Sequence, residues 1–133
     1  MTKQLTVAKR PCGSCPYRKD VPSGVWERHE YEKLPAYDNE TWAQPMGLFM
    51  CHQRDGHVCA GWLACHGGYG PYGLMALRVA GMNGEVPPEL WEYETDVPVF
   101  ASGQEAHDHG VAAIEKPGRD AKQLIGKLTK VIP

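Results

Sequence analysis

Five cysteines and two histidines in this 133-residue chain fall within one stretch of 55 residues and carry the groups best able to bind a metal. They are Cys12, Cys15, Cys51, His52, Cys59, Cys65 and His66. Thiolate sulfur and imidazole nitrogen are the ligands that zinc prefers, and structural zinc sites place four of them at the corners of a tetrahedron. The residue types therefore predict a bound metal.

The segment Cys12-Gly-Ser-Cys15 has the spacing that suits a shared metal. Two cysteines separated by two residues turn inward on one tight loop and occupy two corners of a tetrahedron, and Gly13 relieves crowding there. A dithiol redox centre is less expected, because prolines and a loop follow this pair where a redox fold needs a helix. The other two ligands must come from residues 51–66, where the candidates outnumber the positions left.

Helix geometry narrows the choice of the remaining ligands. If residues 59–66 form a helix, Cys59 and Cys65 lie about 9 Å apart along its axis and on different faces, so we do not expect both to bind one zinc. Cys59 lies near the amino end, where the helix dipole favours a thiolate. We expect the mononuclear quartet to be Cys12, Cys15, Cys51 and Cys59. Cys65, His52 and His66 are alternative ligands. They would be used if the 59–66 segment is unwound or if a second, incomplete site exists.

Two other kinds of metal site stay open. A 4Fe-4S cluster would draw four ligands from the five cysteines, Cys65 included, and the Cys15-Pro16 pair resembles the proline that follows a ligand in bacterial ferredoxins. A metal-dependent hydrolase would use three protein ligands and leave one position for water, with a glutamate such as Glu27 as base. In the preferred interpretation the zinc is structural and no residue is catalytic.

Composition and charge restrict the class of protein. The chain has 15 Gly and 11 Pro, which predicts many loops, and its net charge of −2 makes nucleic acid an unlikely partner. No apolar run approaches the roughly 20 residues that cross a bilayer, and the first residues lack a secretory signal. We therefore expect a cytoplasmic protein with reduced cysteines, no membrane contact and a protein partner.

The hydrophobic pattern predicts short helices joined by loops. Ser23 is expected to cap the first helix, and Ser102 with Glu105 matches a capping box. The expected helices span 24–34, 59–66, 71–81, 103–115 and 118–130, with extended chain at 1–9 and a short strand at 48–51. The pattern predicts one mostly α domain that spans residues 1–133. Its N-terminal half is expected to be loop-rich and stabilised by the metal, and its strands few and short.

Several segments together resemble an uncharacterised family of small Cys/His-rich bacterial and bacteriophage proteins, classified as a domain of unknown function. The segments are Cys12-Gly-Ser-Cys-Pro-Tyr-Arg18, Phe49-Met-Cys-His-Gln53 and Cys59-Ala-Gly-Trp-Leu-Ala-Cys-His-Gly67, with Val21–Trp26, Lys33–Asp38 and Asp96–Phe100. This resemblance covers nearly the whole chain and implies no activity. A weaker resemblance, on the spacing of Cys59 and Cys65, is to WhiB-like iron-sulfur regulators and implies a regulatory role.

The sequence thus predicts a small zinc-binding protein that acts as a binding or regulatory module. The alternatives are an iron-sulfur redox sensor or regulator and a metal-dependent hydrolase. The candidate metal ligands are Cys12, Cys15, Cys51, Cys59 and Cys65.

Overall fold

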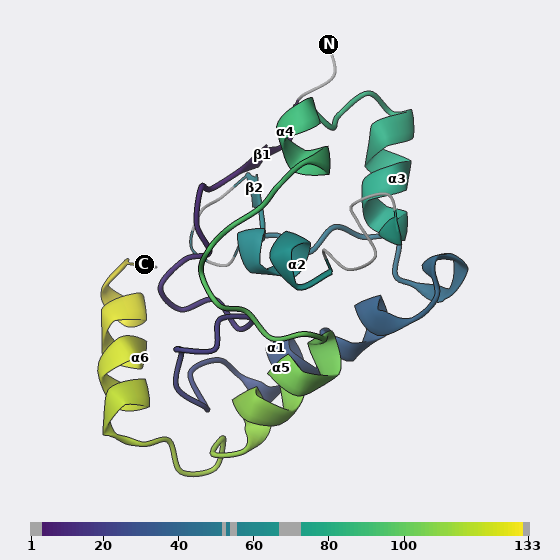
Figure 1. The fold of residues 1–133 in the computed structure, drawn as a ribbon. Coiled ribbons are helices and arrows are strands. Elements are labelled where there is room, and N and C mark those ends of the chain that lie inside the picture. The colour runs from purple at the N-terminus through teal and green to yellow at the C-terminus, as the bar shows by residue number, and fades with distance from the viewer. Residues whose placement is uncertain (1–3, 52, 54–55, 67–72, 132–133) are drawn as a thin grey trace.

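Helix α2 (Ala60–Cys65) lies at the centre of the molecule, with the other elements arranged around it (Figure 1). The computed structural model describes residues 4–51, 53, 56–66 and 73–131, with side chains up to residue 127. In order, the elements are β1 (Thr6–Val7), α1 (Arg28–Glu32), the 3-10 turns η1 (Pro35–Asp38) and η2 (Thr41–Ala43), β2 (His57–Val58), α2, α3 (Met75–Met82), α4 (Pro88–Trp91), α5 (Gly103–Val111) and α6 (Arg119–Val131). The predicted fold class, a small and mostly α domain with few short strands, is confirmed.

Helix α2 is buried on nearly all sides because its side chains are apolar or small. Trp62 and Leu63 are 0% and 3% exposed, and Cys65 is also buried. A short helix that is apolar all round belongs in a core, and α2 packs there against residues from η1 and α3. The helix predicted at 59–66 is therefore confirmed, with Cys59 as its N-cap in extended conformation.

Helix α5 packs against α1 and η1, and its first turn is capped from two directions. The Ser102 hydroxyl accepts a hydrogen bond from the Glu105 amide at 3.1 Å, as the sequence predicts. The Asp38 carboxylate, far away in sequence, accepts from the amides of Gly103 and Gln104 at 2.7 and 2.8 Å. These bonds satisfy amides that no helical carbonyl reaches, so Asp38 ties η1 to the start of α5.

Helix α1 is shorter than predicted, because residues 24–27 are not helical. Gly24 has φ +82°, in the left-handed region, and its amide donates to the Gly110 carbonyl at 2.9 Å. Ser23 does not cap a helix. Its hydroxyl accepts from the Ala113 amide at 2.8 Å and donates to the Gly110 carbonyl at 3.1 Å. The predicted helix at 24–34 was wrong in its first part, because contacts with the end of α5 fix this backbone.

The two short strands pair in parallel, with Thr6 opposite His57 and Val7 opposite Val58. The strand predicted at 48–51 is reduced to one antiparallel bridge between Met50 and Val58. Strand β1 falls within the segment predicted as extended. Residues 71 and 72 of the predicted helix 71–81 lie outside the described residues, and α3 begins at Met75.

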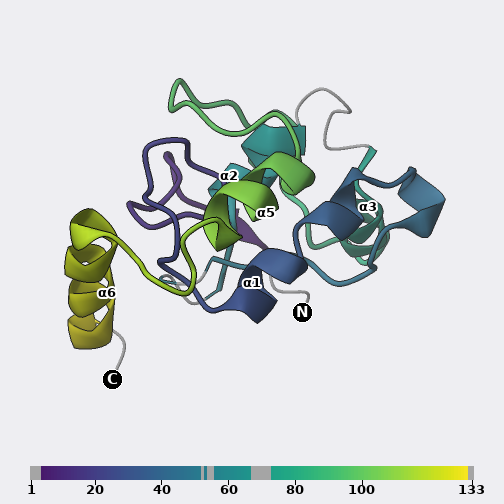
Figure 2. The same cartoon turned by 90° about the horizontal axis from the view of Figure 1, so that it is seen from below.

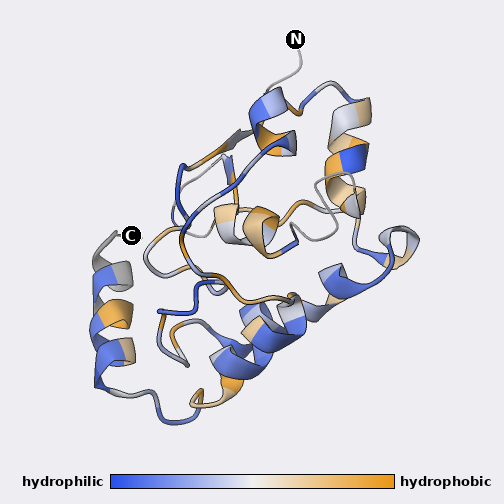
Figure 3. Ribbon diagram, in the orientation of Figure 1, coloured by the Kyte–Doolittle hydropathy of each residue, from blue (hydrophilic) through white to orange (hydrophobic). Residues whose placement is uncertain are grey.

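Helix α6 lies at the edge of the molecule in both views (Figures 1 and 2). Its buried Ala121 packs with Val21 and Val25 in a small second core. Colouring by hydropathy shows α6 as largely hydrophilic and α2 as apolar (Figure 3). Among the described residues, no helix is both long and apolar enough to span a membrane.

Candidate metal centre

The first cysteine pair lies on a tight turn that is fixed to the rest of the protein. The Cys15 amide donates to the Cys12 carbonyl at 3.0 Å, and the Arg18 amide to the Cys15 carbonyl at 3.1 Å. Just after the turn, the Phe100 amide donates to the Tyr17 carbonyl at 2.9 Å. This loop, residues 12–15, is called the cysteine knuckle below.

The second pair comes from two short segments that run antiparallel. The Cys51 amide donates to the His57 carbonyl at 2.8 Å, and the Cys59 amide to the Phe49 carbonyl at 2.9 Å. Cys51 and Cys59 each lie one residue from the bridged pair Met50 and Val58. Because side chains alternate along extended chain, both cysteines leave the same face of this pairing.

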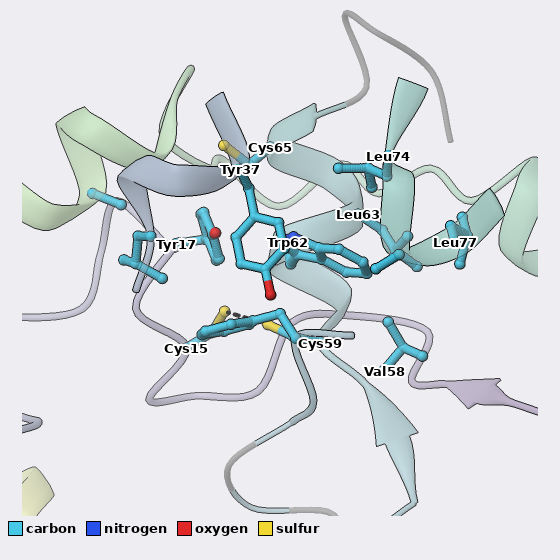
Figure 4. Close-up of a cluster of buried hydrophobic side chains, with 14 of the residues drawn as sticks. Cys15, Tyr17, Tyr37, Val58, Cys59, Trp62, Leu63, Cys65, Leu74 and Leu77 are labelled. Carbon is cyan, nitrogen blue, oxygen red and sulfur yellow. Dashed lines mark hydrogen bonds between the residues drawn. The ribbon is translucent and has the colours of Figure 1, made fainter. Parts of the chain in front are cut away.

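The knuckle and the second pair meet through their sulfur atoms. The sulfurs of Cys15 and Cys59 lie 3.7 Å apart, although 44 positions separate the residues (Figure 4). The Cys12 thiol interacts in turn with the thiols of Cys15 and Cys51. These contacts link four sulfurs in the order Cys51, Cys12, Cys15, Cys59, which is the quartet expected from helix geometry.

The remaining candidate ligands lie elsewhere or outside the described residues. In Figure 4 the Cys65 sulfur lies on the far side of Tyr37 and Trp62 from Cys15 and Cys59. His66 is buried and its ring lies 6.1 Å from that of Tyr17. His52 lies outside the described residues. Figure 4 thus places the side chains of Tyr37 and Trp62 between Cys65 and the pair of Cys15 and Cys59.

The sulfur spacing suits a single metal ion. A zinc–sulfur bond of about 2.3 Å places tetrahedral ligands about 3.8 Å apart, close to the 3.7 Å between Cys15 and Cys59. In a 4Fe-4S cluster each thiolate binds a different iron atom, which keeps the ligand sulfurs out of contact. Within the described part of the chain, no three His, Cys, Asp or Glu side chains already form a group that could hold a metal. The thiols contact one another in pairs. To form a tetrahedron around one ion, the sulfurs of Cys12 and Cys51 must move closer to those of Cys15 and Cys59.

The proximity of the thiols changes their acidity. The hydrogen bond with Cys15 raises the pKa of the Cys12 thiol and, with burial, outweighs the lowering by Cys51. The bond with Cys12 lowers the pKa of Cys15, but the bond with Cys59 and burial together raise it well above its usual value. These thiols therefore keep their protons at neutral pH until a cation replaces them.

Gly61 allows α2 to approach the knuckle. A Cβ atom at this position would overlap the Cys15 sulfur and lie 2.8 Å from the Tyr17 Cβ. The sequence alone assigns Gly61 no such role. The available signal is a glycine inside a helix, which costs helical stability unless close packing requires it.

Ser14 of the knuckle makes two hydrogen bonds that the sequence does not predict, one to the 49–59 segment and one to Trp26. Ser14 is buried, and its hydroxyl accepts a hydrogen bond from the Gln53 side-chain amide. The Trp26 indole donates to the Ser14 carbonyl at 2.7 Å. The Ser14–Gln53 bond thus joins the two loops beside the sulfur contacts, and the Trp26 bond fixes the knuckle to the chain that precedes α1.

Together these features define a small, mostly helical domain in which two cysteine-bearing loops meet against a buried central helix. The chain belongs to DUF6283, a family of unknown function, whose match covers residues 7–130. The predicted membership of a domain-of-unknown-function family is confirmed. Comparison with curated proteins and with solved structures finds no match.

Proposed function

We propose that this chain is a structural zinc-binding module in which Cys12, Cys15, Cys51 and Cys59 bind one zinc ion. The observation that carries the proposal is the 3.7 Å contact between the Cys15 and Cys59 sulfurs. Zinc bound by four thiolates would join the knuckle to the 49–59 segment. Because the unfolded chain holds no preformed site, the binding free energy would add directly to folding stability.

A structural role is better supported than hydrolysis. Four thiolates fill a tetrahedral shell, whereas a catalytic zinc keeps one position open for water. The candidate base Glu27 is 84% exposed on its side chain and lies 3.4 Å from the exposed His29 imidazole. Its carboxylate is therefore held in solvent rather than in a cleft that excludes water.

A binding role has one further supporting feature, near η2. The side chains of Trp42 and Met46 are 76% and 70% exposed. When a partner covers exposed apolar side chains, the burial of their surface lowers the free energy of the complex. The exposed Trp42 and Met46 therefore favour contact of this segment with another protein.

Elemental analysis of protein purified without added metal tests the proposal. The expected result is one zinc per chain, lost in Cys59→Ser and kept in Cys65→Ala. If the protein instead contains iron and sulfide and absorbs near 400 nm, the iron-sulfur sensor is the correct alternative and the zinc module is wrong. Absence of any metal, with none taken up from added zinc, would refute the zinc module.

A further inference from the structure

Solvent exposure divides the four linked sulfurs into two unequal pairs. Cys15 and Cys59 are 1% and 3% exposed, whereas Cys12 and Cys51 are partly exposed. Cys12 also lines a surface pocket of about 340 Å³. A small reagent from solvent therefore reaches the sulfur of Cys12 before it reaches the buried pair.

The pocket beside Cys12 is positively charged. Lys9, Arg10 and Arg18 line it together with Pro11, Cys12 and Gly13, so no acidic residue is in its lining. Arg18 is held in place by Asp20, at 2.8 and 2.6 Å, and by the Pro11 carbonyl at 3.0 Å. Cations beside Cys12 would stabilise the hydroxide that leaves when a peroxide oxidises its sulfur, so the charge of this pocket favours reaction at Cys12 over the buried pair.

Packing determines which sulfur pairs with an oxidised Cys12. Cys15 also contacts Cys12, but its sulfur is buried and packed closely against Gly61, away from solvent. Cys51 contacts Cys12 from a partly exposed position. At Gly13 a Cβ would meet nothing within 4 Å, so the knuckle is open to solvent beside Cys12.

We propose that Cys12 is a site of oxidation by peroxides and that it forms a disulfide with Cys51, which releases the zinc. This inference rests on the proposed zinc site. The Cys12 thiolate attacks one peroxide oxygen, the O–O bond breaks, and hydroxide leaves a sulfenic acid on Cys12. The Cys51 thiolate then attacks the Cys12 sulfur, the S–O bond breaks, and a second hydroxide leaves.

The disulfide takes both of its oxidising equivalents from one peroxide, and a reductant can reverse its formation. Two thiolates lose two electrons to one peroxide, and the two hydroxides take two protons from solvent to become water. A zinc ion left with Cys15 and Cys59 has only two of its four protein ligands and dissociates. A dithiol reductant restores the cysteines, so the zinc centre would act as a redox-sensitive switch.

The test treats the full zinc-loaded chain with hydrogen peroxide and follows three quantities. We expect one equivalent of zinc released to a chromogenic chelator, a fall from five free thiols to three, and a Cys12–Cys51 crosslink in peptide mass mapping. Cys65→Ala is the matched control, with the same zinc release and crosslink. Lys9→Glu with Arg10→Glu should keep the zinc and slow its release several-fold.

The measurements distinguish failure of the oxidation inference from failure of the proposed zinc site. If zinc-loaded protein keeps its metal and its five thiols in a tenfold excess of peroxide, the inference is wrong while the zinc module stands. A crosslink through Cys15 or Cys59, or zinc release at an unchanged rate in the double charge variant, also overturns it. Protein that never binds zinc ends both proposals.

Discussion

Gly61 lies so close to the sulfur of Cys15 that a methyl group in place of its hydrogen would overlap that atom. The two residues belong to different parts of the centre, since α2 carries Cys59 at its N-cap and the knuckle carries Cys15. A residue without a side chain at their contact lets both sulfurs come within 3.7 Å. The glycine in α2 is therefore required by close packing at the proposed metal centre.

Gly61→Ala should separate α2 from the knuckle. Helix propensity alone favours alanine by about 1 kcal/mol, but overlap with Cys15 and the Tyr17 Cβ opposes it. Because the Cys15 sulfur and the Tyr17 Cβ are held in the core, we expect a net destabilisation of about 1–2 kcal/mol and weakened zinc binding. Urea unfolding and zinc content measure the two effects.

Gly126→Ala is the matched control in helix α6. A Cβ there would meet nothing within 4 Å, so only helix propensity acts. We expect a stabilisation of about 0.5–1 kcal/mol with unchanged zinc content. Equal effects of the two substitutions would contradict the role assigned to Gly61.

The single cysteine variants should fall into two groups. Cys15→Ser removes a proposed zinc ligand, so we expect loss of the metal and several kcal/mol of stability. Cys65→Ala removes only a buried sulfur and should cost about 1–2 kcal/mol while the zinc remains. Thermal melts with and without a strong chelator measure this. A Cys65→Ala protein without zinc, beside fully loaded Cys15→Ser, would reverse the assignment.

Zinc affinity should rise with pH. The pKa values of Cys12 and Cys15 are raised in the metal-free fold, so zinc must displace their protons at neutral pH. We expect the affinity to increase more than tenfold between pH 6.5 and 7.5, measured by competition with a chelator of known affinity. An affinity independent of pH over this range would show that these thiols are not ligands.

Metal-free protein should show the opposite trend in alkali. Burial raises the pKa of Cys65 from its usual value of 9.0 to about 12. A group whose pKa is raised by folding contributes stability that is complete below the unfolded-state value and lost as pH rises toward the folded-state value. The free energy of unfolding should therefore fall between about pH 9 and 12. Cys65→Ala should flatten part of this decline, and an unchanged slope in the variant would be inconsistent with it.

Much of the helical structure follows from local sequence. The apolar run around Trp62 predicts α2, and Ser102 with Glu105 predicts the start of α5. Helix geometry also separates Cys59 from Cys65, because six residues on a helix set them on different faces, whereas the choice of metal ligands stays a prediction.

What the sequence misses depends on contacts between distant segments. The left-handed Gly24 is fixed by the Gly110 carbonyl, and strands of two residues, such as β1, carry no readable alternation. The contact of Gly61 with Cys15 is likewise invisible until α2 and the knuckle are placed together. Local sequence patterns predict which residues form helices, but not which glycines or carboxylates make the contacts between helices and loops.

Asp38 illustrates such a long-range contact and can be tested by substitution. Its carboxylate accepts from two amides at the start of α5, so Asp38→Ala should cost about 1–2 kcal/mol. Glu115→Ala is the control, since its side chain is 91% exposed in a 3.4 Å pair with Arg28, and it should cost less than about 0.5 kcal/mol. Both values come from urea unfolding. Equal losses would contradict the capping role.

X-ray absorption at the zinc edge, on protein purified without added metal, tests the central claim most directly. If the sulfurs of Cys12, Cys15, Cys51 and Cys59 surround one zinc ion, the spectrum will show four sulfur neighbours at about 2.3 Å. A shell with nitrogen or oxygen in place of sulfur, or a protein that contains no zinc, would contradict the four-thiolate centre.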